Sequence, residues 1–122
     1  MTPSPMTLDE ITRFNADWLQ AWTDKAVPRL LGFYAEDCVY KDAQTAAGLS
    51  GRAALRAYLE GLFTATPAMA YTPDEVWPIP GGFCGRWYCE IVGVGRMRGF
   101  DLVILEGDRI ALNEVYVHQL GT

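Results

Sequence analysis

The sequence predicts an α+β fold in which helices come first and a strongly curved antiparallel sheet follows. Two observations carry this prediction: apolar residues recur at helical spacing as far as Pro67, and beyond it the pattern changes to strand-like segments. Helices followed by consecutive antiparallel strands pack on one face of the sheet. We therefore expect a cone-shaped sheet with three N-terminal helices on its concave face, and a ligand cavity between the two layers.

Three helices are expected in the first half of the chain, together with one short strand. Thr7 and Glu10 have the spacing of a capping box, which marks the start of the first helix. Proline suits the first turn of a helix, and Pro28 therefore indicates the start of a second one. The expected helices run from Leu8 to Asp24, from Val27-Pro28 through Tyr34 to a break near Glu36-Asp37, and from Gly51-Arg52 to just before Pro67; the short strand is Cys38 to Lys41.

Four longer strands are expected after the third helix. Proline and glycine residues separate the first two, and a tight turn over residues 106–109 precedes the last. Gly93, Gly95 and Gly99 cluster near the remaining turn and indicate bulges or a sharp bend of the sheet. The expected strands are Ala68–Trp77, Phe83–Val94, Met97–Glu106 and Arg109–Leu120.

Length and charge narrow the classes of function. A chain of 122 residues is expected to form one domain over residues 7–122, with residues 1–6 disordered. The formal net charge is −5 and the basic residues are scattered, so no nucleic-acid partner is expected. No apolar run is long enough for a membrane span, and the N-terminus lacks a signal-peptide pattern, so no membrane association is expected.

Cysteine and histidine usage indicates the compartment and the absence of metal chemistry. Cys38, Cys84 and Cys89 are odd in number and form no CxxC pair, which favours a reducing, cytoplasmic environment. His118 is the single histidine, so one chain does not offer a His-rich metal site. We expect neither a metal nor a cofactor.

Alternation along the third long strand indicates that both faces of the sheet are covered. Phe100, Leu102 and Ile104 share one face, and Asp101 and Val103 share the other. A face left in water would be polar. The apolar outer face therefore predicts a homodimer formed sheet to sheet, and a long loop lying over the sheet is the alternative.

Two aspartates are the candidates for chemistry. Asp101 lies among apolar residues, where an ionised carboxylate is costly to bury, so it must be paired, hydrogen-bonded or protonated. It belongs to a functional site, or it forms an ion pair with Arg96 or Arg98, or it caps a bulge near Gly99. Asp42 follows the first short strand, where it either makes an Asx turn or acts as a base at the mouth of a pocket.

Three separated motifs carry a family resemblance. They are FYAEDCVYKDA at 33–43, GLSGRAALRAYLEGL at 48–62 and GFDLVILEGDRIALNEVYVHQL at 99–120. In order and spacing they resemble the nuclear transport factor 2-like (cystatin-like) superfamily, which includes steroid Δ-isomerases, SnoaL-like polyketide cyclases and limonene epoxide hydrolase. The resemblance covers nearly the whole chain and implies a single SnoaL-like domain. Because this fold hosts many unrelated activities, the resemblance defines the fold more narrowly than the function.

The resemblance also suggests roles for individual residues. In the steroid isomerases the aspartate after the first short strand is the general base, and Asp42 occupies that place. A protonated aspartate on a later strand donates to the oxyanion in those enzymes, and Asp101 looks like its counterpart. Trp18 stands at or near the position of their first-helix tyrosine. The side chains expected to bind the ligand are Trp18, Tyr34, Tyr40, Tyr58, Leu62, Phe63, Trp77, Trp87, Val103 and Asn113.

Two functions follow. The first is isomerase- or cyclase-like proton transfer on a small, largely apolar carbonyl compound, in which Asp42 removes a proton and neutral Asp101 donates to the oxyanion. The second is a non-catalytic dimeric domain that binds a small hydrophobic molecule or serves in association. A raised pKa of Asp101 in an open pocket favours the first function, and an ion pair of Asp101 with an arginine favours the second.

Overall fold

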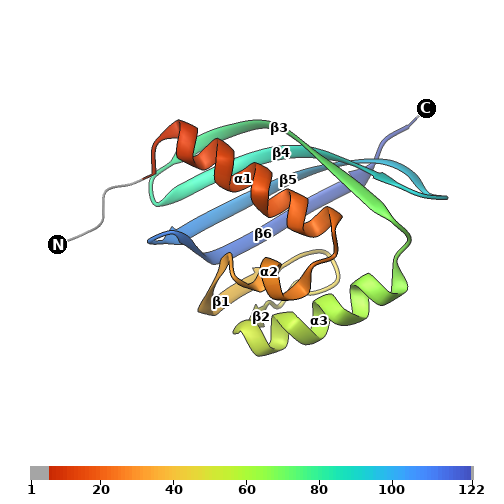
Figure 1. Ribbon diagram of the computed structural model, residues 1–122, viewed down its shortest axis with the longest axis horizontal. Helices are drawn as coiled ribbons and strands as arrows, with labels where there is room; N and C mark the ends of the chain where they lie inside the picture. The colour runs from red at the N-terminus through yellow and green to blue at the C-terminus, as the bar shows by residue number, and fades with distance from the viewer. Residues whose placement is uncertain (1–5, 122) are drawn as a thin grey trace.

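Three helices and one six-stranded sheet form the fold of residues 6–121, which the computed structural model describes (Figure 1). The helices are α1 (Leu8–Thr23), α2 (Val27–Leu31) and α3 (Arg52–Ala65); the strands are β1 (Tyr34–Lys41), β2 (Leu49–Ser50), β3 (Met69–Ile79), β4 (Gly82–Ile91), β5 (Gly95–Glu106) and β6 (Arg109–Gln119). The disorder expected for residues 1–6 falls mainly outside the described residues. Met6, which is described, packs against the core.

The sheet is mixed rather than wholly antiparallel. Its strand order is β2-β1-β6-β5-β4-β3, and β1 pairs with β6 in parallel, whereas the other neighbouring pairs are antiparallel. The long chain segment between β1 and β6 allows this parallel pairing, which a hairpin could not make. The expectation of a purely antiparallel sheet is therefore corrected at β1.

The second helix is shorter than expected, because Tyr34 belongs to β1. α2 ends at Leu31, and the backbone of Tyr34 is paired with that of Ile110 in β6. The Tyr34 side chain is completely buried. Sheet pairing with a segment far along the chain thus overrides the local helical pattern, and the expected strand at Cys38 extends back by four residues to Tyr34.

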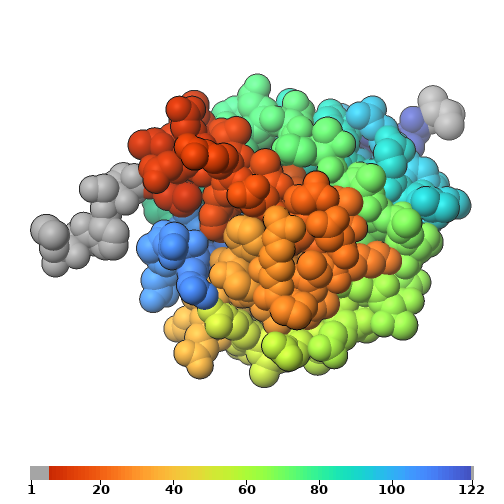
Figure 2. Space-filling model, viewed as in Figure 1, coloured from red at the N-terminus to blue at the C-terminus, as the bar shows by residue number. Residues whose placement is uncertain are grey.

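The helices cover one face of the sheet, as predicted, and Figure 2 shows that face closed by α1, α2 and α3. The expected capping box is present: Thr7 Oγ1 accepts from the Glu10 N–H, and the Thr7 N–H donates to the Glu10 carboxylate. At the other end of α1, Lys25 Nζ donates to the carbonyl oxygens of Phe63 and Thr66. Lys25 therefore ties the end of α1 to the end of α3.

A close cross-strand contact shapes the inner face of the sheet. Trp87 in β4 is paired with Gly99 in β5. A Cβ atom built on Gly99 would lie 2.0–2.3 Å from three adjacent atoms of the indole. Such similar distances arise when the atom sits over a ring face rather than beside an edge. The indole therefore lies flat over Gly99 and occupies the space of the missing side chain.

This contact predicts that Gly99→Ala destabilises the protein. The added methyl group must displace either the indole or a strand, and overpacking of this kind costs about 1–3 kcal/mol. Urea denaturation of wild type and variant would measure the difference. Gly61→Ala is the matched control: Gly61 is in α3 and its added Cβ would meet nothing within 4 Å. We expect that variant to be more stable than wild type by up to about 1 kcal/mol. Equal effects of the two substitutions would contradict the packing argument.

Candidate functional site

A cavity of about 280 Å³ lies between the helices and the inner face of the sheet, with most of its lining apolar. Side chains from α1, α3 and five strands contribute to it, together with the loop that follows β1. The lining residues are Leu19, Trp22, Tyr40, Asp42, Ala43, Gln44, Tyr58, Leu62, Thr66, Met69, Tyr71, Trp87, Cys89, Ile91, Met97, Asp101, Val115 and Val117.

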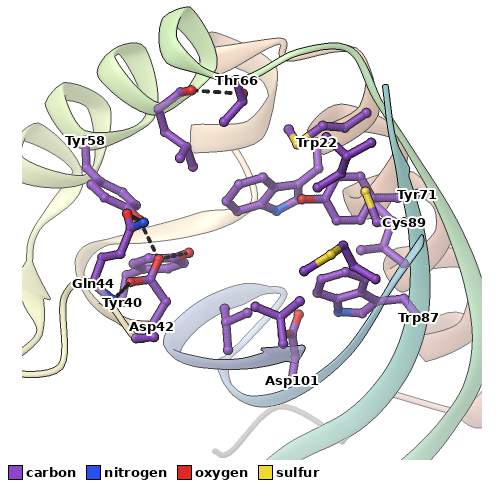
Figure 3. A pocket seen from close by; sticks show the side chains of 18 residues that line it. Trp22, Tyr40, Asp42, Gln44, Tyr58, Thr66, Tyr71, Trp87, Cys89 and Asp101 are labelled. Carbon is purple, nitrogen blue, oxygen red and sulfur yellow. Dashed lines mark hydrogen bonds between the residues drawn. The ribbon is translucent and has the colours of Figure 1, made fainter. Parts of the chain in front are cut away.

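Both candidate aspartates line this cavity, from different walls (Figure 3). Asp42 comes from the loop after β1, and Asp101 comes from the middle of β5. Five aromatic rings form a continuous series between the two walls. Ring centroids are 5.7 Å apart for Tyr58 and Tyr40, 6.4 Å for Tyr40 and Trp22, 6.1 Å for Trp22 and Tyr71, and 4.9 Å for Tyr71 and Trp87. We call this series the aromatic arc.

Asp42 makes an Asx turn and lines the cavity at the same time, so the two alternatives for this residue are not exclusive. Its Oδ1 accepts from the backbone N–H groups of Gln44 and Thr45, each at 2.9 Å, and from Thr45 Oγ1 at 3.0 Å. Its Oδ2 accepts from the hydroxyl of Tyr40 at 2.9 Å and from that of Tyr58 at 2.5 Å. Both carboxylate oxygens are thus fully hydrogen-bonded within the chain.

These hydrogen bonds determine the protonation state of Asp42. Partial burial raises its pKa, but the hydrogen bonds from Tyr58, Tyr40, Thr45 and the Gln44 N–H outweigh it, and the net pKa lies below the ordinary value. In return, burial and the contact with Asp42 raise the pKa of Tyr58. The group is therefore a fixed carboxylate held by two neutral phenols. The role of Asp42 as a general base stays a prediction.

Asp101 has the opposite environment. Its side chain is 3% exposed, and burial raises its pKa to about 8, an increase that the neighbouring Trp87 and Asn113 reduce only in part. Neither neighbour completes a hydrogen bond to it: Asp101 Oδ1, Trp87 Nε1 and Asn113 Nδ2 are all buried without a partner among the described residues. At neutral pH Asp101 is therefore mostly a neutral acid, with hydrogen-bonding capacity to spare.

Asp101 forms no ion pair with an arginine among the described residues. Arg96 pairs with Glu90 at 3.2 Å and Arg98 contacts His118, and both arginines are exposed. Arg52 donates instead to the backbone carbonyl of Tyr34 at 2.9 Å. The raised pKa and the cavity position of Asp101 are the outcome that favours chemistry over a structural ion pair.

A hydrogen-bonded series of buried side chains lies behind Asp101. Trp18 Nε1 donates to the Tyr34 hydroxyl at 3.3 Å, and this hydroxyl donates to Asn113 Oδ1 at 2.9 Å. Because its oxygen is engaged by Tyr34, the amide of Asn113 is oriented with its nitrogen free toward the interior. Trp18 and Tyr34 therefore act through Asn113 and do not reach the cavity.

The structure brings some of the expected ligand-binding residues together and separates others. Tyr40, Tyr58, Leu62 and Trp87 line the cavity with the two aspartates. Trp18, Tyr34, Phe63, Val103 and Asn113 are buried in the layer behind the lining. Trp77 lies on the outer face, where its ring contacts Phe100 and Arg86, because its position in β3 points away from the helices. The ligand role expected for these six residues is corrected accordingly.

Several cavity residues escaped the sequence interpretation. Trp22 is in α1 on the same helical stripe as Leu19, and this spacing could have indicated its direction. Tyr71 lies two residues after the buried Met69 in β3, so strand alternation would have placed the two on one face. Cys89 is a buried thiol whose pKa is raised by burial to about 11, so it stays protonated at neutral pH.

A match to a family model identifies the family of this chain. Residues 15–113 match the model of the SnoaL-like domain, and the chain therefore belongs to this family. No curated protein matched the sequence. Among the described residues, no helix has the length and apolar character that crossing a membrane would require.

Solved structures share the fold at low sequence identity. A SnoaL-like protein of unknown function from Burkholderia thailandensis has a TM-score of 0.80 at 14% identity, covering 93% of this chain and 99% of that one. A nuclear transport factor 2-like protein of unknown function from Burkholderia xenovorans has a TM-score of 0.77 at 14% identity, covering 97% and 90%. A protein of ketosteroid isomerase-like fold from Catenulispora acidiphila, solved with trimethylamine, has a TM-score of 0.74 at 18% identity, covering 98% and 88%. These likenesses confirm the nuclear transport factor 2-like fold.

The environment of Asp101 predicts a pH-dependent cost in stability. A free aspartate ionises near pH 4, whereas Asp101 in the folded protein ionises near 8. Between these values the folded protein holds a proton that the unfolded chain has lost, so its stability falls as pH rises. Asp101→Asn removes this titration. We expect the free energy of unfolding of the variant, relative to wild type, to increase from about pH 4 to about pH 8 by a few kcal/mol at most.

Urea denaturation at intervals of pH would measure this difference. Asp108→Asn, in the exposed turn between β5 and β6, is the control for a loss of carboxylate elsewhere. If the stability difference between Asp101→Asn and wild type does not change with pH, Asp101 has the same pKa in the folded protein and in the unfolded chain, and the prediction is wrong.

Proposed function

We propose that this protein binds a small, largely apolar carbonyl compound in the cavity and catalyses an isomerase-type proton transfer on it. The observation that supports this most strongly is the pair of carboxyl groups from different elements that line one apolar cavity, with environments that push their pKa values in opposite directions. Acid and base roles are commonly divided in this way within one site. The SnoaL-like and ketosteroid isomerase-like relationships agree with this reaction class.

In this proposal the two carboxyl groups have different roles. The neutral Asp101 donates a hydrogen bond to the carbonyl oxygen as negative charge develops there, and its buried position makes this interaction strong. Asp42 accepts the α-proton and returns it to another carbon, which completes the shift. Trp87 and Asn113, whose N–H groups are unpaired, stabilise Asp101 as it gains charge.

Binding without turnover is the second candidate, and the hydrogen bonds of Asp42 favour it. Five donors of the same chain already satisfy this carboxylate, and each lowers its affinity for a proton. For Asp42 to act as a base, at least one tyrosine hydroxyl must turn away from it. A non-catalytic pocket needs no such movement.

Proton exchange on a small ketone would separate the two candidates. We expect wild type to accelerate loss of the α-proton signal of 3-cyclohexenone in D₂O, followed by ¹H NMR. Asp42→Asn, which removes the base, and Asp101→Asn, which removes the acidic donor, should each lower the rate by about a hundredfold. The rate should also fall as pH rises through about 8, because Asp101 then loses its proton.

The controls identify which candidate fails. Asp108→Asn should exchange at the wild-type rate. Exchange no faster than in buffer, with the ketone nevertheless bound, would support the binding candidate. If Asp101→Asn alone slows the reaction and Asp42→Asn does not, the proton acceptor is a group other than Asp42.

We also propose that the outer face of the sheet associates with a second copy of the chain, in a cytoplasmic setting. Phe100 is 40% exposed and Tyr116 is 61% exposed on this face, beside Trp77. Exposed aromatic side chains that lie together mark contact surfaces more often than single exposed apolar residues do. The three cysteines are free, which agrees with a reducing compartment.

Introducing a charge at the centre of this face should prevent association. We expect wild type to sediment as a dimer and Phe100→Glu as a monomer, because the carboxylate would be buried against an apolar surface. Val92→Glu is the matched control, since Val92 is an exposed apolar residue in the turn between β4 and β5. Circular dichroism would confirm that both variants are folded. A monomeric wild type, or dimers of both variants, would contradict the proposal.

A further inference from the structure

The cavity has an unusual balance of charge for a pocket that binds neutral molecules. Two of its lining residues are acids, and none of the described residues that line it is lysine, arginine or histidine. Lys41, which precedes Asp42, is paired with Glu114. Arg52, the first residue of α3, donates to the Tyr34 carbonyl. The negative charge of Asp42 therefore has no basic partner in the cavity.

The rings of the aromatic arc border the same space. Trp87 lies with one face on Gly99, so its other face is turned away from the sheet and toward the cavity that it lines. Trp22 is near the middle of the arc, stacked with Tyr40 at an interplanar angle of 29° (Figure 3). The face of an aromatic ring carries partial negative charge and attracts cations within about 6 Å of its centre, tryptophan most strongly.

Hydrogen bonding restricts the kind of cation that suits this site. Oδ1 of Asp42 accepts three hydrogen bonds and Oδ2 accepts two, so neither oxygen has room for a further donor. The hydroxyl hydrogens of Tyr40 and Tyr58 are committed to the same carboxylate. Beside Asp42, a cation that needs hydrogen bonds would gain little, whereas one without N–H groups can interact through its charge and through contact with the rings.

We propose that the cavity binds an organic cation with a quaternary or fully alkylated nitrogen, seated against Trp22 and Tyr40 beside the Asp42 carboxylate. Its apolar substituents lie on Leu62, Met69 and Ile91, and its polar end reaches Asp101. Asp101 Oδ1 is buried and unpartnered there, and it supplies the hydrogen-bonding position that a polar group on such a ligand needs. The inference rests on the binding candidate above, because a cation beside Asp42 leaves that carboxylate no role as a base.

A pair of isosteric probes tests the inference on the wild-type protein. Choline and 3,3-dimethylbutan-1-ol have the same shape and differ in whether a positive nitrogen or a neutral carbon is at the centre of the three methyl groups. We expect choline to bind at least about tenfold more tightly, from its attraction to the ring faces and to Asp42. Titration followed by NMR would give both dissociation constants.

The four tryptophans make the measurement site-specific. Trp22 and Trp87 line the cavity, whereas Trp18 is in the buried layer behind it and Trp77 is on the outer face. The indole N–H signals of Trp22 and Trp87 should therefore shift with choline, and that of Trp77 should not. A shift of Trp77 without one of Trp22 would locate binding outside the cavity and overturn the inference.

Variants test the source of the preference. Asp42→Asn removes the charge and should reduce the preference for choline over the alcohol, and the part of the preference that comes from the aromatic rings should remain. Asp108→Asn is the matched control and should bind choline as wild type does. Trp22→Leu, which keeps the charge and removes a ring face, gives an independent variant and should weaken choline more than the alcohol.

The outcomes distinguish this inference from the proposed function. Equal affinity for the two probes in wild type, with the Trp22 and Trp87 signals shifting for both, would overturn the cation preference and leave the binding candidate intact. No binding of either probe would overturn the cation inference, and binding of the ketone described above would then show whether the cavity admits ligands at all. Acceleration of ketone exchange that choline does not inhibit would also contradict it.

Discussion

The indole of Trp87 lying flat over Gly99 is the contact on which the site depends. The indole fills the space that a side chain at Gly99 in β5 would occupy. An aromatic ring therefore covers this part of the inner face of the sheet. It also places a large ring next to Asp101, which is two positions beyond Gly99 on β5 and whose side chain is buried. Burial raises the pKa of Asp101, and the neighbouring Trp87 reduces that increase only in part. A glycine in a strand interior, ordinarily unfavourable, is thus part of how the site is formed.

The two acids illustrate how differently one fold can treat the same side chain. Asp42 is at the end of a strand, where backbone N–H groups and hydroxyls are close at hand, and they hold it as a carboxylate. Asp101 is in mid-strand, where its own backbone groups are committed to the ladder and apolar neighbours surround it. Supply of donors, rather than distance from solvent alone, separates their protonation states. The cavity between them therefore has one fixed charge and one exchangeable proton at neutral pH.

Much of the fold was predictable from local patterns. The capping box at Thr7, the helical stripes and the strand alternation placed nearly all the elements, and the motif positions of Asp42 and Asp101 led to one cavity. Tyr34 was misplaced because its strand pairing is with β6, which no local window contains. Trp18 was expected in the site because it stands at or near the position of the isomerases' first-helix tyrosine, and Trp77 because aromatic residues suit a pocket. Neither ground says which way a side chain faces. Trp22 and Tyr71 were missed although helical spacing from Leu19 and strand alternation from Met69 indicate their directions.

The sequence by itself determined the order of helices and strands, the membership in the SnoaL-like family and the two residues that are candidates for chemistry. These depend on periodicity and on motifs that are local in the chain. The tertiary structure decided the parallel pairing of β1 with β6, the aromatic arc and the protonation of Asp101. Each of these depends on which distant residues meet and how much water they exclude. Burial and the number of hydrogen-bond donors within reach are properties of packed space, and only the folded chain specifies them.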